Sequence, residues 1–406
     1  MTTGTPTRRI GTVQQALDAA AELSAAYAAE ATDRDADRRP PHDQVRALKD
    51  SGLLALSVPA AYGGLEAPAT VLAEVFRLFG HADGSLAQIP HSHFTFLEAV
   101  RLQGSQEQKA FFYAEVLGGA LLANAQTERG PHPIDVDETT LVPTPTGDYV
   151  LSGRKFYATG SLFADWLVVR ASLSDGSGDR PTSKTPKAIA FVPRSAAGVQ
   201  IVDDWDGMGQ RTTASGTVTL DDVAVSAAHV IGFSQIFTEP STYGARAQLL
   251  HAAIDVGIAT GALEEGVRQA AKARPHFEAG VDTATDDPTL IALAGELTVT
   301  VRGAQALLAD AARAVDAAAA DVDEDSAATA SIAVAIAKVA ATRASLQASS
   351  VLFELGGTRS AGGAANLSRY WRDARTHTLH DATRWKLQHI GRHTLSGTRP
   401  PRHGQL

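Results

Sequence analysis

The segment Gly207–Val225 has the sequence GMGQRTTASGTVTLDDVAV and closes a central region whose pattern differs from both of its flanks. Its second half, Thr217–Val225, is rich in Val, Thr and Leu, which favour β-strands. Similar short runs precede it, with Gly, Pro, Asp and Ser between them: Leu121–Ala125, Asp148–Thr159, Trp166–Leu173, Ala188–Val192 and Val199–Val202. Because no helical pattern separates these runs, we predict an antiparallel barrel for the centre of the chain.

Both flanks of this region have helical spacing. The earlier flank contains alanine- and leucine-rich stretches, at His42–Ser51, Pro68–Ala82, Ser85–Gln103 and Gln106–Leu117 among others, and the later flank contains Arg246–Ala273, Pro288–Ala320 and Ser326–Leu355. We therefore predict an α+β protein that is mostly α. It has an N-terminal helical domain (1–118), a central antiparallel β-barrel (119–235) and a C-terminal four-helix bundle with a tail (236–406). Ser174–Pro186 is predicted to be a mobile surface loop, and Gly397–Pro401 a loosely ordered arm.

The composition of the chain argues against several classes of function. The chain has 406 residues, with 36 Lys and Arg against 45 Asp and Glu, which gives a net charge of −9. An acidic chain is not typical of proteins that bind nucleic acid or anionic membranes. The absence of cysteine excludes disulfides, thiolate nucleophiles and cysteine-ligated metal sites. We see no apolar run of membrane-spanning length and no secretion signal, so we expect a cytoplasmic protein.

Four local motifs, in the order in which they occur, resemble the acyl-CoA dehydrogenase superfamily. They are Leu56–Gly64, Ala123–Glu128, Gly207–Val225 and Leu355–Gly357. The resemblance covers nearly the whole chain and implies a flavin beside the central domain. It also implies a homotetramer, built as a dimer of dimers, in which the long C-terminal helices form the interface and each flavin lies between subunits.

One residue type that the dehydrogenases require is missing. Their catalytic glutamate lies in one of two places, and these places hold Asp381 and Ala247 in this chain. The segment Thr376–Asp381, THTLHD, instead resembles the monooxygenase branch of the superfamily, as do Ala87–Phe94 and Ala273–Asp282. That branch uses O₂ and reduced FMN from a separate flavin reductase, with FAD as the open alternative. It passes one oxygen atom through a C4a-hydroperoxyflavin to a heteroatom, here most simply the sulfur of a small organosulfur compound.

The resemblance assigns roles to particular residues. The candidate catalytic residues are His93, Asn124, Ser161, His377 and His380. His377 and His380 are three positions apart and would share one face of a helical turn, and histidine titrates near neutral pH. His91 and Trp205 are candidates for the substrate pocket. The alternative for each residue is a purely structural role: the histidines would be core or surface residues, Asn124 would cap a turn, and Trp205 would pack in the core.

The candidate cofactor-binding residues are Thr127, Tyr157, Thr159, Arg274, Phe277, Gly356, Gly357 and Arg359. Hydroxyls at Thr159 and Ser161 would contact the flavin ring, unless they bond within the sheet. Arginine offers a bidentate fork to phosphate, so Arg274 and Arg359 are the phosphate candidates. We find no Gly-x-Gly-x-x-Gly motif after a strand and no cluster with metal-ligand spacing, and we predict no metal.

Three alternatives remain open at this point. The first is an N-hydroxylase of the same fold that acts on an amine. The second is an acyl-CoA dehydrogenase that uses Asp381 as its base, and the third is a non-catalytic member of the fold that would tolerate His380→Ala.

Overall fold

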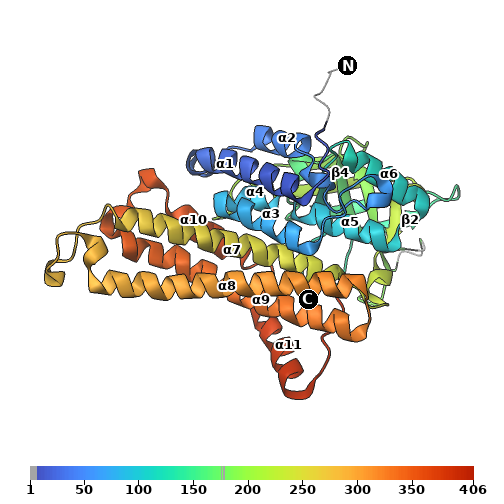
Figure 1. The fold of residues 1–406 in the computed structure, drawn as a ribbon. Coiled ribbons are helices and arrows are strands. Elements are labelled where there is room, and N and C mark those ends of the chain that lie inside the picture. The colour runs from blue at the N-terminus through green and yellow to red at the C-terminus, as the bar shows by residue number, and fades with distance from the viewer. Residues whose placement is uncertain (1–6, 175, 177–178) are drawn as a thin grey trace.

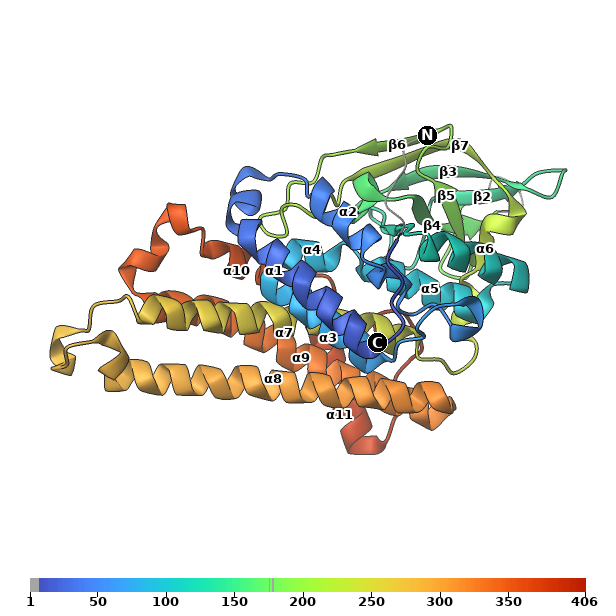
Figure 2. The ribbon, with the colours of Figure 1, turned by 45° about the horizontal axis from the view of Figure 1, so that its top comes forward.

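The computed structural model describes residues 7–174, 176 and 179–406. Part of the predicted loop Ser174–Pro186 therefore lies outside the described residues. Helices come first, then a sheet, then long helices, as predicted (Figure 1). Figure 2 shows the sheet at one end of an elongated helical layer.

The N-terminal helices are α1 (Val13–Asp37), α2 (His42–Asp50), α3 (Ala69–Ala82), α4 (Gly84–Gln88), α5 (His91–Gln103) and α6 (Gln106–Leu117). Local signals set several of their ends. The Ser105 side chain caps α6 and Gln108 reciprocates, which satisfies two free N–H groups of the first turn. The helix expected over Ser85–Gln103 is in fact two helices, because Ile89 and Pro90 interrupt it and α5 starts after the proline.

The strands are β1 (Leu122–Ala125), β2 (Thr140–Pro143), β3 (Tyr149–Lys155), β4 (Trp166–Leu173), β5 (Lys187–Pro193), β6 (Val199–Val202), β7 (Thr217–Val225) and β8 (Val230–Gly232). They form one sheet, in the order β6-β7-β3-β2-β4-β5-β8, which curves into a half-barrel. Most neighbours are antiparallel, as expected.

Two pairings depart from the expected antiparallel pattern, because β1 and β2 both run parallel to β4. β1 lies along Trp166–Val169 and β2 along Ser172–Leu173, so the two short strands share one edge of β4. The parallel direction is possible because long connections separate these strands from β4 in sequence. The loop between β1 and β2 therefore leaves the sheet beside β4, between the positions of Val169 and Ser172.

The C-terminal region contains α7 (Tyr243–Ala270), α8 (Pro288–Ala320), α9 (Glu324–Gly356), α10 (Ser368–His377) and α11 (Thr383–Ser396). Three long helices form the bundle, and the short α10 packs against α7 and α9, while α3 of the N-terminal domain packs on α7 and α8. Gly80 and Gly257 allow α3 and α7 to cross closely, because a Cβ at Gly257 would lie 2.6 Å from the His81 nitrogen. α11 extends away from the bundle (Figure 1).

The predicted arm, Gly397–Pro401, has no helix or strand and is mostly exposed, but contacts within it and after it hold the chain end against the bundle. Leu406 is 4% exposed, and Lys386 donates a hydrogen bond of 2.7 Å to the Gln405 carbonyl oxygen. Arg399 also pairs with Asp325 at 2.7 Å. A buried apolar terminus and these polar contacts hold the tail against the bundle, contacts that sequence composition alone does not reveal.

Candidate active site

Four histidine rings from three parts of the chain meet where α5, α7 and α10 converge. His91 stacks on His251 with ring centroids 3.7 Å apart. His380 lies 4.0 Å from His251 by the same measure, and His377 lies 5.1 Å from it. The expected pair, His377 and His380, does share one turn, because the His380 N–H donates to the His377 carbonyl oxygen at 3.0 Å.

A buried polar chain runs inward from this cluster. His251 Nδ1 and His377 Nε2 are 3.0 Å apart, and His377 Nδ1 lies 2.5 Å from Asp255 Oδ1. Lys338 Nζ donates to the other carboxylate oxygen, Asp255 Oδ2, at 2.5 Å. Lys338, Asp255, His251 and His377 are each at most 1% exposed. Each buried polar group therefore has a partner, which is what makes its burial tolerable.

Helix geometry explains how these side chains meet. Ala247, His251 and Asp255 follow each other at intervals of four on α7, so they lie on one face. His91 Nε2 bonds to the carbonyl oxygen of Ala247 at 2.9 Å, which seats the first turn of α5 against this face. Lys338 reaches the same face from α9.

Burial sets the charge states of the rings. It lowers the pKa of His91 to about 3 and that of His380 to about 4, with repulsion from neighbouring cations adding to the effect. The pKa of His251 is also held well below its usual range by burial and by the adjacent rings. These three imidazoles are therefore neutral near pH 7. Burial alone would raise the pKa of Asp255, but Lys338 and His377 outweigh it and keep the carboxylate ionised.

The second part of the site is the edge of the sheet where β1 ends. Asn124 Nδ2 donates to the Tyr157 carbonyl oxygen at 3.2 Å. Tyr157 has a positive φ of 54° and its ring is edge-on to Trp205, with centroids 6.1 Å apart. Thr159 Oγ1 lies 2.7 Å from Ser215 Oγ. Amide, hydroxyl and aromatic groups thus lie together on a surface where Tyr157 is 42% exposed.

Thr127 and Ser161 flank this edge. Thr127 accepts a hydrogen bond of 2.8 Å from the Phe156 N–H through its carbonyl oxygen. Ser161 is buried, and its Oγ is 3.5 Å from the Ala214 carbonyl oxygen, the outer limit for a hydrogen bond. The Ser161 hydroxyl is therefore weakly held and is available to another partner.

Two contacts connect the histidine cluster to the sheet edge. Ile89, two residues before His91, lies beside Gly160, because a Cβ at Gly160 would meet Ile89 Cγ2 at 3.4 Å. The Gln210 N–H donates to Asp373 Oδ1 at 2.6 Å, which joins the segment before β7 to α10. The histidine cluster and the sheet edge are therefore neighbours in the fold.

His93 does not join the cluster. Its Nε2 bonds to the Leu54 carbonyl oxygen at 2.8 Å, and its Nδ1 accepts from the Leu122 N–H at 3.1 Å. Both ring nitrogens are thus used by backbone groups, and burial lowers the pKa of His93 to about 4. His93 thus links α5 to η1 (Leu53–Ala55) and β1 in this structure, and its catalytic role stays a prediction.

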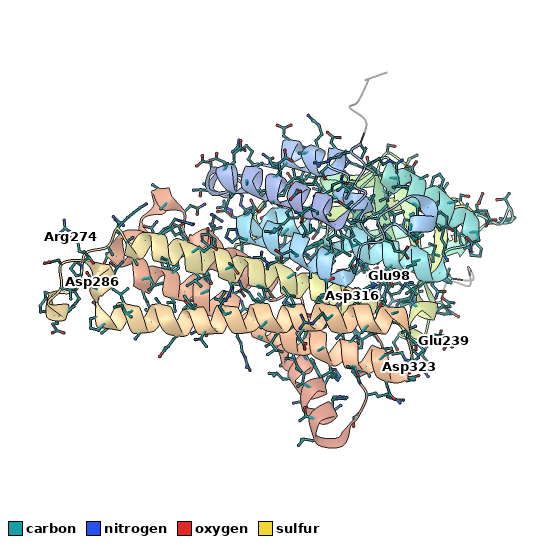
Figure 3. All side chains as sticks on the ribbon, in the orientation of Figure 1. Glu98, Glu239, Arg274, Asp286, Asp316 and Asp323 are labelled. Atoms are coloured by element: carbon teal, nitrogen blue, oxygen red, sulfur yellow. The ribbon has the colours of Figure 1, made fainter. Side chains whose placement is uncertain are left out.

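The remaining candidates lie at the far end of the bundle. Figure 3 shows Arg274 beyond the end of α7, at the tip opposite the sheet. Phe277 is 84% exposed there, and Gly356 is at the same tip, because a Cβ on it would lie 2.9 Å from Gln269 Cβ. Gly357 and Arg359 follow directly and are exposed. At about 1.5 Å per residue, α7 rises by about 28 Å along its axis from His251 to Ala270. The residues at this tip therefore lie far from the histidine cluster and from the sheet edge of the same chain.

Sequence reasoning missed His251, Asp255 and Lys338. A usable signal was present in each case. Lys338 is the one charged residue in the otherwise apolar run Ala333–Ala341, and His251 and Asp255 are four apart in an alanine-rich helix. A charge in such a run is costly unless it is paired, so it points to a buried partner.

Asp381, the alternative base, is already engaged. Its Oδ2 lies 2.7 Å from Lys386 Nζ, and both side chains are 3% exposed. Burial would raise the pKa of Asp381, but Lys338 and Lys386 outweigh it and hold the pKa below the usual range. A cavity of about 310 Å³ opens beside this pair, between the start of α11 and the C-terminal tail. Across the described residues, no group of three or more His, Asp or Glu side chains is arranged to hold a metal ion.

Comparison with known proteins places the chain in a family. Models of the acyl-CoA dehydrogenase N-terminal, middle and C-terminal domains match residues 12–120, 123–223 and 249–385. The dibenzothiophene monooxygenase of Rhodococcus qingshengii is 36% identical over 366 residues, which cover 87% of this chain and 86% of the relative. The probable FMNH₂-dependent monooxygenase SfnC of Pseudomonas putida is 30% identical over 400 residues, covering 95% and 96% of the two chains.

A solved structure agrees with these relatives. The FMN-bound TdsC of Paenibacillus sp. A11-2 superposes with a TM-score of 0.90 at 33% identity, covering 96% of this chain and 100% of TdsC. The predicted resemblance is confirmed by these matches. The chain belongs to the acyl-CoA dehydrogenase family and, within it, to the flavin-dependent monooxygenases that include the dibenzothiophene monooxygenases.

Proposed function

We propose that this protein oxygenates the sulfur atom of a small organosulfur compound, using O₂ and reduced FMN. The observation that carries the proposal is the cluster of His91, His251, His377 and His380, which lies where a dehydrogenase of this fold needs a carboxylate base. The named activities of the relatives, which include a dibenzothiophene monooxygenase, support sulfur as the target.

The geometry argues against acyl-CoA dehydrogenation. A general base works best when its pKa lies near the working pH. Asp381 is paired with Lys386 and its pKa is lowered, so it is a weak base. Ala247, at the other family position, offers a backbone carbonyl that His91 already uses.

The residues at the sheet edge fit a flavin ring. Asn124 and Thr159 offer an amide and a hydroxyl of the kind that pairs with the polar edge of an isoalloxazine, and the half-exposed Tyr157 ring offers an aromatic surface. Thr127 lies on the same edge. When bound there, reduced FMN supplies the two electrons that convert one atom of O₂ to water while the other goes to the substrate.

The chain's own residues then have distinct tasks. The Asn124 amide and the Ser161 hydroxyl hydrogen-bond to the polar edge of the flavin ring, and Trp205 and His91 line the substrate pocket. His380, the one exposed ring of the four, exchanges protons with solvent, and His377 keeps a proton on Nδ1, towards Asp255. The closely packed rings exclude water, which favours oxygen transfer over loss of peroxide.

The electrons come from a separate flavin reductase. This proposal is supported by the printed name of the SfnC relative, an FMNH₂-dependent enzyme, and by the lack of a dinucleotide-binding glycine motif in the sequence. FMN rather than FAD is the cofactor that the FMN-bound TdsC structure supports.

We further propose a cytoplasmic homotetramer. Arg274, Phe277, Gly356, Gly357 and Arg359 would contact the phosphate end of a flavin held by a neighbouring subunit, since they lie too far from Asn124 of their own chain. The outer face of α8 exposes apolar side chains, with Val299 at 74% and Ile291 at 57% exposure. By length and composition alone α8 and α9 also resemble membrane spans. α9 is largely buried in the bundle, and a second copy would cover α8.

The test combines the protein with an FMN reductase, NADH and isotopically labelled O₂. We expect an aryl sulfide to gain one labelled oxygen atom, detected by mass spectrometry, and a matched secondary amine to gain none. His380→Ala should abolish the product but preserve FMN binding. Exclusive oxygenation of the amine would overturn the sulfur assignment, and dehydrogenation of an acyl-CoA thioester would overturn the whole proposal.

A further inference from the structure

The chain of contacts behind the histidine cluster has a feature that the proposed reaction does not explain. Of the four rings, His377 is the one bonded to a carboxylate, at 2.5 Å from Asp255 Oδ1. His91 bonds to a backbone carbonyl, and His251 bonds to His377. Lys338 shares the same carboxylate through its second oxygen.

The carboxylate fixes the tautomer of His377. Asp255 is ionised and accepts hydrogen bonds only, so His377 must carry a proton on Nδ1. In a neutral ring His377 Nε2 is then an acceptor, and His251 must donate to it from Nδ1. His251 Nε2 is therefore left as the acceptor nitrogen of that ring.

A proton that enters the cluster has a defined path. If it binds His251 Nε2, the Nδ1 proton of His251 passes to His377 Nε2, and one N–H bond breaks as another forms. The product is an imidazolium on His377, bonded to Asp255. The reverse transfer returns the shared proton to His251 Nδ1, and loss of the Nε2 proton of His251 restores both neutral rings.

Lys338 limits how firmly this proton is held. One carboxylate charge is shared between the Lys338 ammonium and the His377 ring, so Lys338 opposes the imidazolium that Asp255 favours. Other charged or titratable groups also face this site: His91 from α5, His251 from α7, His380 after α10, and the Asp381–Lys386 pair from the start of α11.

We propose that Asp255 and Lys338 are positioning residues with opposite effects, which make His377 a reversible proton store for the histidine cluster. Asp255 orients His377 and favours its charged form, whereas Lys338 keeps that form weak enough to release its proton. The inference deepens the proposed oxygenation and rests on it for the use of the stored proton.

The test compares Asp255→Asn and Lys338→Met with Ser345→Ala on α9, where a buried hydroxyl donates at 3.2 Å to the Thr342 carbonyl oxygen of its own helix and lies outside the contacts from Lys338 to His251. The imidazole protons and nitrogens of His377 are followed by NMR across pH in the flavin-free protein, and the His377→Gln variant assigns them. The wild type should show a low-field Nδ1 proton. Asp255→Asn should remove this proton and shift the protonation of His377 to lower pH, whereas Lys338→Met should shift it to higher pH.

Opposite shifts are the deciding result, because general loosening of the core would move both variants in the same direction. Shifts in the same direction, or a low-field proton that persists in Asp255→Asn, would overturn the proposal. If Asp255→Asn does not fold, the neutral double variant Asp255→Asn/Lys338→Met replaces it, and loss of the low-field proton is again expected.

Turnover provides a second readout. We expect kcat to fall about 100-fold in Asp255→Asn, the scale of lost acid–base catalysis, with the FMN dissociation constant close to that of Ser345→Ala. Asp255→Glu should recover part of the loss and the low-field proton. Because the NMR titration uses neither flavin nor substrate, failure of the oxygenation assay would overturn the proposed function without deciding the proton store.

Discussion

Replacing Gly209 with alanine tests how the β domain is joined to the helix that carries His377. An added Cβ would overlap the Arg372 carbonyl group and lie 2.6 Å from the Asp373 nitrogen. This is about 1 Å inside a normal contact distance, and the neighbours are backbone atoms that cannot turn aside. The segment must therefore move away from α10.

The expected cost follows from the contacts that would be lost. The Gly209 N–H donates to Thr376 Oγ1 at 3.1 Å, and the Gln210 N–H donates to Asp373 Oδ1 at 2.6 Å. Two hydrogen bonds contribute about 1 kcal/mol each, and overpacking costs about 1–3 kcal/mol. We expect Gly209→Ala to lower the free energy of unfolding by about 3–5 kcal/mol.

Urea unfolding followed by tryptophan fluorescence measures this change, and FMN titration reports the effect on the site. The matched control is Gly391→Ala on α11, where nothing lies within 4 Å of the added Cβ and alanine should stabilise the helix slightly. Gly209→Ala with a stability within about 0.5 kcal/mol of the wild type would refute the close packing of this segment on α10.

Three further variants test other parts of the structure. Burial raises the pKa of Asp373 to about 7 from 3.8, so the folded chain keeps a proton that the unfolded chain releases. The contribution of Asp373 to stability should be full below about pH 4 and be lost towards pH 7, by at most about 4 kcal/mol, and Asp373→Asn should remove this part of the pH dependence of the urea midpoint. Lys155→Met leaves the partly buried Glu128 without its cation, whereas Asp137 keeps Arg170 at 2.7 Å, so the loss of the charged hydrogen bonds should cost about 2–3 kcal/mol in thermal unfolding. Val299→Asp should split the proposed tetramer in size-exclusion chromatography, with helicity by circular dichroism unchanged.

Sequence patterns located the elements that carry strong local signals. Trp166–Leu173, Thr217–Val225 and Pro288–Ala320 have the predicted bounds, because apolar runs end at Gly, Asp or Pro. β2 and β8 were missed, because β2 includes a proline, Pro143, which argues against a strand, and β8 has only three residues, too few to show a period. The parallel pairing of β1 with β4 depends on long-range contacts that composition does not encode.

The candidate site also contains residues that the sequence predicts and residues that it does not. The spacing of His377 and His380 was readable because both lie on one turn. Their partners His251, Asp255 and Lys338 come from two other helices, and only the packing of α7 against α9 and α10 brings them together. Arg274 and Arg359 stay predictions, because their proposed ligand belongs to a neighbouring subunit.

The most direct test of the account is to mix the protein with reduced FMN without oxygen, add O₂ and follow absorbance by stopped flow. We predict a transient band, distinct from reduced and oxidised flavin, that decays faster when an organic sulfide is present. The histidine cluster would then be protecting an oxygenated flavin from water. Immediate return to the oxidised spectrum, unaffected by any sulfide, would contradict the monooxygenase assignment.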